Sequence, residues 1–262
     1  MNGYFEQLKT AWLGRDVRFL QETESTNRDC DVAAAGGATE GLVISAETQT
    51  AGRGRLGRTW FSPQHANLYF SILLRPAVDP VAATTLPLVV GLAVAETLME
   101  TFPALAPQIK WPNDIWIQGR KVCGILCEMQ LAGERVGAVV AGVGINVNLT
   151  RVMFPEELRA SATALQQEVG HVVARGVLLA SIMNHLEPLY CAWQQQGFAP
   201  MVERIQRVDA LRGQPLRMHL VGNPVEGLGA GIQADGALLI RLSDGTLQAI
   251  YSGEAQTIRT TD

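Results

Sequence analysis

The hydrophobic residues in the first part of the chain alternate between helical and strand-like spacings. Hydroxyl and amide side chains at residues 25–29 precede an alanine-rich stretch that ends at Gly36-Gly37, which are the start and stop signals of a helix. A glycine- and arginine-rich segment without periodicity indicates a loop. The order predicted for this part is a short amphipathic helix at 4–13, a strand at 17–20, a helix from 25 to 36, a strand at 41–48, the loop at 49–59 and a strand at 67–75.

The central part begins with a long apolar stretch at residues 80–102, which predicts a buried helix with Pro87 near its first turns. Strand-like runs follow, and the short gaps at Gly119-Arg120 and Ala132-Gly133 fit hairpin connections. After an irregular stretch the pattern becomes helical again. The strand-like runs are 108–111 with 115–118, 122–130 and 136–148, and the later helices are 172–196 and 200–208, interrupted at Gly197.

From Leu211 the pattern changes to short strands. Turns are predicted at Gly222-Asn223, Asp235-Gly236 and Asp244-Gly245, and the last two are strong hairpin dipeptides. The order of elements therefore favours an α+β domain with a mixed sheet and packed helices at residues 1–209, followed by a small barrel-like β domain at residues 210–262.

Composition narrows the classes of function. Hydrophobic residues make up 47% of the 262 and charged residues 18%, which is typical of a folded globular protein. The net charge of −4 argues against a general affinity for the nucleic-acid backbone, so any anion site must be local. The first residues lack the organisation of a signal sequence, and no segment approaches the roughly 20 apolar residues of a membrane helix, so we expect neither export nor membrane insertion.

The four cysteines lack the paired spacing of a zinc site. We expect all of them to be ordinary reduced thiols, mostly buried, and the protein to be cytoplasmic. They are Cys30, Cys123, Cys127 and Cys191.

The segment 52–58, with the sequence GRGRLGR, is the first candidate for chemistry. Glycine lets the backbone approach a phosphate closely, and guanidinium groups supply charge and forked donors. The segment is neither a dinucleotide-binding nor a Walker signature. A solvated basic loop and an RNA-binding arginine–glycine tract remain alternatives, and the neighbouring Trp60 and Phe61 are either base-stacking or core residues.

A second cluster lies in the predicted hairpins that follow the long helix. A reaction that joins a carboxylate to a triphosphate needs cations to neutralise and orient the two anions, and Lys110 and Lys121 are candidates, although each alone could be a solvated surface charge. Asp114 or Glu128 could hold Mg²⁺. Glycines at 124 and 144 would permit a ligand to approach the sheet closely.

Taken together, four blocks resemble the biotin protein ligase (biotin–acetyl-CoA-carboxylase ligase) family, most strongly over residues 20–150. The blocks are ESTN at 24–27; Gln49 and GRGRLGRTW at 52–60 with FSP at 61–63 and NL at 67–68; KWPNDI at 110–115 with Lys121 and GIL-x-E at 124–128; and GVGINVN at 142–148. The resemblance implies a class II synthetase-like catalytic domain and a C-terminal SH3-like β-barrel.

The resemblance also implies roles for individual residues. Short polar side chains would contact the ureido ring of biotin, a flexible loop would fold over the ligand, and a lysine would bridge the biotin carboxylate and the α-phosphate of ATP. The ureido contacts are Ser25, Thr26, Asn27 and Gln49; the loop residues are Arg53, Gly54 and Arg55, with Arg55 retaining the adenylate; the lysine is Lys121; the adenine contacts are Trp60 and Asn146; and weaker matches are Lys110 for pyrophosphate and Asp114 for the metal.

The implied reaction is attack of the biotin carboxylate on the α-phosphorus of ATP, followed by transfer of biotin to a lysine of a biotin carboxyl carrier domain. No covalent enzyme intermediate is needed, and His65 is expected to be structural. About 20 residues before the first block cannot hold the DNA-binding domain of longer family members, so a short form without DNA binding is expected. The resemblance allows a homodimer through the sheet edge. Alternatives are a lipoate or octanoyl ligase of the same fold and a non-catalytic biotin- or RNA-binding module.

Overall fold

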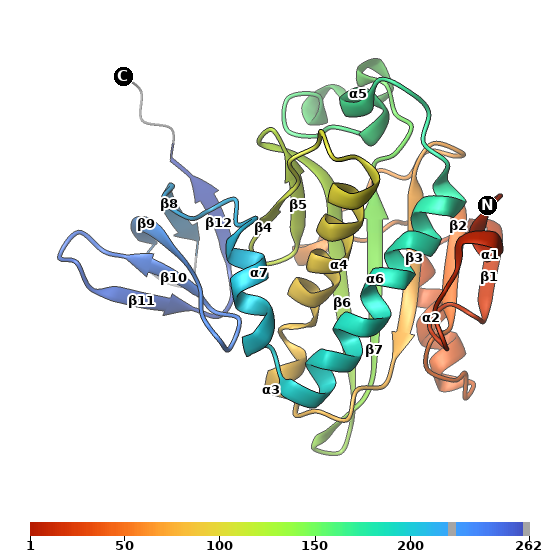
Figure 1. Ribbon diagram of the computed structural model, residues 1–262, viewed down its shortest axis with the longest axis horizontal. Coiled ribbons are helices and arrows are strands. Elements are labelled where there is room, and N and C mark those ends of the chain that lie inside the picture. Colours follow the sequence, from red (N-terminus) through yellow and green to blue (C-terminus); the bar gives the residue numbers. More distant parts are fainter. Residues whose placement is uncertain (220–223, 259–262) are drawn as a thin grey trace.

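The computed structural model describes residues 1–219 and 224–258, which form a seven-stranded mixed sheet packed with helices and a second, five-stranded sheet (Figure 1). The strand order of the first sheet is β1-β2-β3-β7-β6-β5-β4; β1 and β2 are parallel and the other neighbours are antiparallel. Its strands are β1 (Val17–Thr23), β2 (Val43–Gln49), β3 (Leu68–Leu74), β4 (Gln108–Lys110), β5 (Asp114–Ile117), β6 (Arg120–Ala132) and β7 (Arg135–Ile145).

Helices cover both faces of this sheet, which explains why β3 is apolar and buried along its whole length. The long helices α4 (Leu86–Thr101) and α6 (Arg175–Gln196) pack on each other and on one face, where Figure 1 shows them crossing in front of β6 and β7. Helix α2 (Thr26–Ala35) packs on the opposite side of β2, β3 and β7. The predicted α+β class is therefore confirmed.

The expectation that no segment approaches the apolar length of a membrane helix was wrong. The segment Pro80–Thr101, which contains α3 (Pro80–Ala83) and α4, is long and apolar enough by composition to cross a membrane. In the fold it is a core helix, since 72% of its most apolar window is buried within the protein. The predicted single helix is also interrupted at Thr84 and Thr85, and Pro87 lies in the first turn of α4.

The first predicted helix is shorter than expected. Only Tyr4–Gln7 (α1) is helical. The backbone N–H groups of residues 11–13 donate to the carboxylate of Glu187 on α6, and the Tyr4 hydroxyl donates to the Gly14 carbonyl. These tertiary bonds replace the i→i−4 bonds that would have continued the helix. The later helices are shortened too: α6 begins at Arg175 after the short α5 (Leu165–Val169), and α7 spans Val202–Gln206.

The second sheet is antiparallel throughout, with the order β11-β10-β9-β8-β12. Asp235-Gly236 and Asp244-Gly245 form the predicted turns, both with glycine in the left-handed region, whereas the predicted turn at Gly222-Asn223 lies outside the described residues. The domain boundary at 209/210 stays a prediction, which is supported by the pairing of Asp209 with β4 before the chain enters the second sheet. The strands are β8 (Pro215–His219), β9 (Val225–Ile232), β10 (Leu238–Arg241), β11 (Leu247–Ile250) and β12 (Glu254–Thr257).

Candidate functional site

Two adjoining cavities lie beneath the glycine–arginine loop that connects β2 to β3. We call the larger one, about 330 Å³, the wide cavity, and the smaller one, about 50 Å³, the narrow pocket. Five residues line both cavities, which places them at the junction. They are Gly54, Arg55, Trp60, Asn113 and Lys121.

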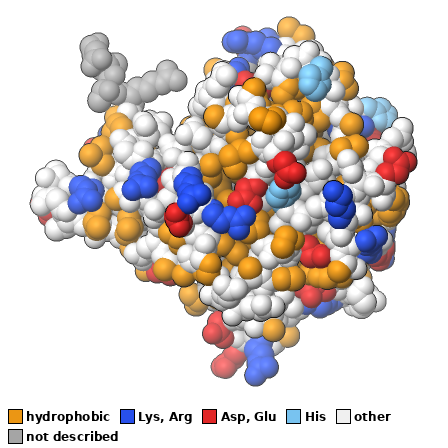
Figure 2. Space-filling view, in the orientation of Figure 1, with side chains coloured by type: hydrophobic (Ala, Val, Ile, Leu, Met, Phe, Trp, Pro, Cys, Tyr) orange, Lys and Arg blue, Asp and Glu red, His pale blue; other side chains and the backbone are white. Residues whose placement is uncertain are grey.

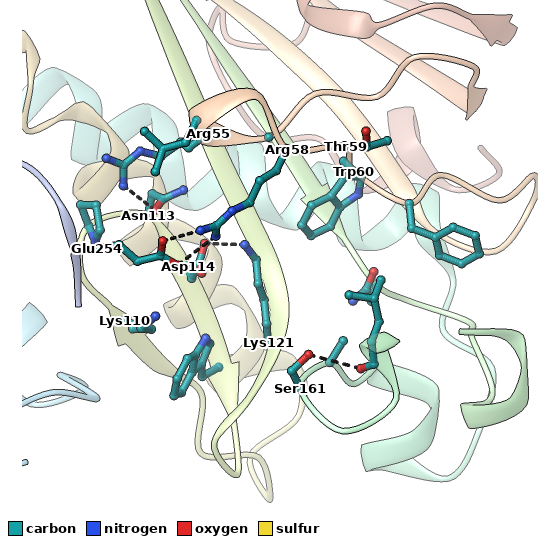
Figure 3. Close-up of a pocket in the computed structure, with 18 of the residues that line it drawn as sticks. Arg55, Arg58, Thr59, Trp60, Lys110, Asn113, Asp114, Lys121, Ser161 and Glu254 are labelled. Atoms are coloured by element: carbon teal, nitrogen blue, oxygen red, sulfur yellow. Dashed lines mark hydrogen bonds and ion pairs between the residues drawn. The ribbon is translucent and has the colours of Figure 1, made fainter. Parts of the chain in front are cut away.

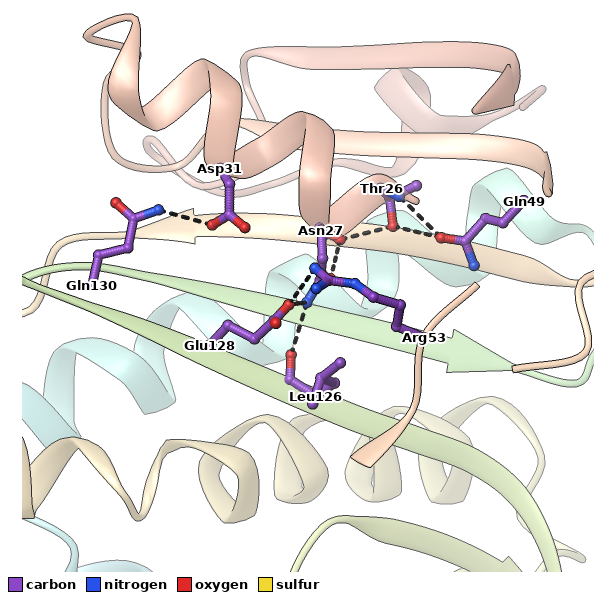
Figure 4. Close-up of polar contacts among 9 residues, drawn as sticks. Thr26, Asn27, Asp31, Gln49, Arg53, Leu126, Glu128 and Gln130 are labelled. Atoms are coloured by element: carbon purple, nitrogen blue, oxygen red, sulfur yellow. Dashed lines mark hydrogen bonds and ion pairs between the residues drawn. The ribbon is translucent and has the colours of Figure 1, made fainter. Parts of the chain in front are cut away.

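The floor of the narrow pocket is polar and lies where α2 begins (Figure 4). The backbone N–H of Thr26 donates to Gln49 Oε1 at 3.0 Å, at the end of β2. The buried Ser71 hydroxyl lies 2.8 Å from Thr26 Oγ1 and 2.6 Å from Asn27 Oδ1. The structure thus brings Ser25, Thr26, Asn27 and Gln49 together, although the Ser25 side chain makes no capping hydrogen bond. Ser71 was missed; its polar side chain in the apolar strand β3 was the available signal.

A shared carboxylate joins this floor to the loop above it. Glu128 Oε2 accepts a hydrogen bond from Asn27 Nδ2 at 2.6 Å and another from Arg53 at 2.8 Å (Figure 4). Arg53 therefore closes one side of the narrow pocket. Glu128 is neutralised by Arg53, and the described part of the chain holds no group of three or more His, Cys, Asp or Glu side chains arranged for a metal.

At the junction, Lys121 Nζ lies 2.7 Å from Asp114 Oδ1 and 5.2 Å from the centre of the Trp60 ring (Figure 3). Asp114 comes from β5 and Lys121 from the neighbouring β6. Both side chains are mostly buried, with exposed fractions of 32% for Lys121 and 16% for Asp114. The lysine ammonium is thus held where the two cavities meet.

Basic side chains gather in the wide cavity. Arg55 donates to Asn113 Oδ1 at 3.0 Å, and Arg58 forms a two-point ion pair with Glu254 of β12, one bond being 2.9 Å long (Figure 3). Burial lowers the pKa of Lys110, an effect that Asp114 and Glu254 oppose. The hydrogen bond from Arg58 holds the pKa of Glu254 below its ordinary value. Such a set of cations suits a polyphosphate.

The other end of the wide cavity is more apolar. Trp60, Phe61, Phe154 and Leu158 line it, together with the amide of Asn146. Aromatic and apolar walls with one amide are suited to a purine base.

The catalytic region and the C-terminal region both match family models. Residues 20–146 match the model of the "Biotin/lipoate A/B protein ligase family", and residues 213–256 match the "Biotin protein ligase C terminal domain". The chain is 35% identical to the biotin–[acetyl-CoA-carboxylase] ligase of Paracoccus denitrificans, over 85% of this chain and 92% of that protein. The chain belongs to the biotin/lipoate A/B protein ligase family.

Other members of the family show the same likeness. The bifunctional ligase/repressor BirA of Bacillus subtilis is 33% identical over 95% of this chain, which spans 76% of that protein's length. The biotin protein ligase of Aquifex aeolicus, solved in complex with biotin and ATP, superposes with a TM-score of 0.80 at 31% identity, covering 94% of this chain and all of the other. The family fold thus extends over both sheets.

The two glycines that were expected to admit a ligand, Gly124 and Gly144, line the narrow pocket and also lie against the Trp60 ring. A Cβ atom at Gly144 would lie 2.5 Å from the Trp60 ring, and one at Gly124 would lie 2.8 Å from it. A side chain of the protein itself therefore takes part of the space above these glycines. A third glycine, Gly142, makes the same kind of room for Asn27, whose Oδ1 would lie 1.9 Å from an added Cβ.

The second sheet contributes to the wide cavity, which the sequence did not indicate. Gly253 and Glu254 line it, although they lie in the region predicted as a separate domain. Asn113 and Arg58 were noted only as parts of motifs, and their contacts with Arg55 and Glu254 give them places at the site. Identifying these residues needed the relative placement of the two sheets.

The cysteines and His65 take no part in the two cavities. All four cysteines are free thiols; Cys30 and Cys123 are buried, and Cys127 and Cys191 are partly buried. Burial raises the pKa of the Cys30 thiol to about 12, which keeps it protonated. His65 pairs with Glu47 at 3.0 Å, outside the cavities.

Proposed function

We propose that this protein uses ATP to convert biotin into biotinyl-5'-AMP and then transfers the biotinyl group to a lysine of a biotin carboxyl carrier domain. The observation that carries the proposal is the position of Lys121, whose side chain lines both the polar narrow pocket and the cation-rich wide cavity. An ammonium group at this junction can neutralise a carboxylate arriving from one side and an α-phosphate arriving from the other.

The narrow pocket is proposed to take the ureido ring. Thr26, Asn27 and Gln49 offer donors and acceptors for its N–H and C=O groups, as Ser25 does at the helix start. Arg53 and Gly54 of the loop line this pocket too, so the loop lies directly beside the proposed position of the ring.

The wide cavity is proposed to take ATP, with its base between Trp60 and Asn146 and its phosphates near Arg55, Arg58 and Lys110. A biotin carboxylate oxygen attacks the α-phosphorus, and pyrophosphate leaves as the new P–O bond forms. The neutral amine of the carrier lysine then attacks the acyl carbon, AMP leaves and the nitrogen loses a proton. Closure of the loop, with Arg55 over the adenylate, keeps water away from the mixed anhydride.

We propose Asp114 as the protein carboxylate for Mg²⁺ that accompanies the nucleotide. A mostly buried carboxylate beside the phosphate region fits, because Mg²⁺ takes one or two carboxylates together with phosphate oxygens and water. Mg²⁺ would neutralise phosphate charge there. Asp114 would have to exchange its ion pair with Lys121 for these ligands.

The carrier domain of acetyl-CoA carboxylase is the partner that the names of the relatives support. A cytoplasmic location is supported by the free thiols. A homodimer through the sheet edge and the absence of DNA binding stay predictions. The face seen in Figure 2 carries basic and acidic side chains side by side, which suits neither a nucleic acid nor an acidic membrane surface in particular.

Biotin-dependent exchange of labelled pyrophosphate into ATP tests the proposal. Exchange with biotin, with little exchange for lipoate or octanoate, is the expected result. Lys121→Gln should lower the exchange rate at least about 100-fold, because it removes the charge that meets both anions. Exchange with lipoate but not with biotin would contradict the proposal and indicate a lipoate ligase instead. Binding of biotin without any exchange would favour a non-catalytic module.

A further inference from the structure

Two buried amide side chains lie in contact behind the base end of the wide cavity. Asn67 precedes β3 and has no exposed surface, and Asn146 follows β7 and is 5% exposed. Asn67 Nδ2 lies 3.4 Å from Asn146 Oδ1, and Asn146 Nδ2 lies 3.0 Å from the carbonyl oxygen of Thr163. Asn146 lines the cavity, whereas Asn67 does not.

Backbone groups decide which way both amides point. The backbone N–H of Val147 can only donate, and it lies 2.9 Å from Asn67 Oδ1. The amide nitrogen of Asn67 therefore faces Asn146, so Asn146 must present its oxygen to Asn67. The carbonyl of Thr163 can only accept, and it independently demands the nitrogen of Asn146 on the other side.

The carbonyl of Thr163 is itself fixed. Its backbone N–H donates to the Lys121 carbonyl at 2.9 Å, and its hydroxyl donates to Glu168, which also pairs with Arg120 at 2.8 Å. Neither end of the two-amide chain can reverse without leaving a buried polar group unsatisfied, at a cost of about one hydrogen bond or more.

We infer that Asn67 is a positioning residue that sets base specificity by fixing the orientation of Asn146. This inference rests on the proposed use of ATP. In the fixed orientation the Asn146 oxygen retains one acceptor site and its nitrogen one donor. Adenine offers an N6–H donor beside the N1 acceptor at its Watson–Crick edge, which matches this pair.

Hypoxanthine reverses the pattern, because its O6 accepts and its N1–H donates. It would match only a reversed amide. Since Asn67 and Thr163 both oppose reversal of the Asn146 amide, the site should select ATP over ITP. ITP is the appropriate comparison because its base differs from adenine at these two atoms and lacks the additional amino group of guanine. Asn67 thus acts on a base that it does not touch.

Biotin-dependent adenylate formation with ATP and with ITP tests the inference. The unsubstituted protein should prefer ATP by roughly 100-fold in kcat/KM, since two hydrogen bonds are mismatched with ITP. Asn67→Asp keeps the oxygen that accepts from Val147 N–H but replaces the nitrogen that faces Asn146 by a second oxygen. This oxygen favours the reversed orientation of the Asn146 amide. The preference for ATP should then fall by about tenfold. Asn67→Ser adds no charge, and its shorter side chain cannot reach Asn146, so the preference for ATP should fall in this variant as well.

Asn148→Asp is the matched control. Asn148 also clamps a backbone N–H and a carbonyl, both of Val173, and it lines neither cavity. It should leave the ATP/ITP ratio unchanged. A ratio near one in the unsubstituted protein, equal losses with both nucleotides in the Asn67 variants, or loss of biotin binding in both of those variants would overturn the inference. Absence of adenylate formation from either nucleotide in the unsubstituted protein would instead refute the proposed function.

Discussion

Gly142→Ala is the sharpest test of the narrow pocket. Gly142 lies in β7 between β3 and β6, and the side chain of Asn27 occupies the space where a Cβ would be. The added carbon would lie 1.9 Å from Asn27 Oδ1, whereas carbon and oxygen normally approach no closer than about 3.3 Å. Asn27 must therefore retreat by roughly 1.4 Å.

A movement of that size would break the two short bonds of Asn27. Its bond with Ser71 and its bond with Glu128 are both 2.6 Å long. Loss of the neutral bond costs about 1 kcal/mol and loss of the charge-assisted bond about 1.5–3 kcal/mol. Replacing a strand glycine by alanine returns about 0.5–1 kcal/mol. The expected net loss is about 1.5–3.5 kcal/mol in the free energy of unfolding, or a fall in Tm of roughly 3–14 °C.

Scanning calorimetry measures the fall in Tm, and titration with biotin in the absence of ATP measures the affinity of the narrow pocket for biotin. We expect the Kd for biotin to rise at least about tenfold, because Asn27 no longer lies where the ring needs it. Gly137→Ala is the control: it lies in the same strand, and its Cβ would meet Ala132 Cβ at 3.1 Å and no pocket residue. Unchanged Tm and unchanged biotin affinity in Gly142→Ala would refute the reasoning.

Three further substitutions address the loop, the ion pair between the sheets and the N-terminal segment. Arg55→Ala should increase the release of biotinyl-adenylate into solution by at least about tenfold, measured by chromatography, because a charge-assisted contact is lost; unchanged release would contradict the retaining role. Arg58→Gln should change Tm by less than about 3 °C, since its pair with Glu254 is largely exposed, but should raise the KM for ATP in pyrophosphate exchange. Burial acts to raise the pKa of the Glu187 carboxyl, but the N–H groups of residues 11–13 outweigh burial and lower it. The ionised carboxylate therefore stabilises the fold fully above its ordinary pKa of 4.5, and this contribution to the free energy of unfolding is lost as the pH falls through the lowered pKa. Glu187→Gln should lower Tm at pH 7 and flatten the acid limb of a Tm–pH profile; an acid limb as steep as that of the unsubstituted protein would contradict this.

Most elements of the fold could be predicted because their signals are local. The caps and glycines around α2 and the two aspartate–glycine turns of the second sheet mark their own boundaries. The end of α1 could not be predicted, since residues 11–13 bond to Glu187, which lies far along the chain. A partner that distant leaves no trace in a helical periodicity.

The candidate site was predictable to the extent that its residues occur in motifs. The polar residues at 25–27, Gln49 and Lys121 lie within short blocks of recognisable spacing, and the structure brings them to adjoining cavities. Ser71 and Glu254 lie outside these blocks. Ser71 takes part because β3 packs against α2, and Glu254 because β12 lies beside the loop. Their contribution depends on tertiary placement, which residue spacing does not encode.

Trp60 shows why small residues in a strand do not identify what fills the space above them. Gly124 and Gly144 make room, and the indole ring occupies it with its Nε1–H buried and without a partner among the described residues. An unsatisfied buried N–H costs about 1–3 kcal/mol, and the contact with Lys121 offsets about 0.5–1 kcal/mol of that. Apolar contact of the ring with β6 and β7 must supply the remainder. A ligand that draws Lys121 toward its own charge would remove one of the contacts that hold the ring, so occupation of the junction and the position of Trp60 are linked.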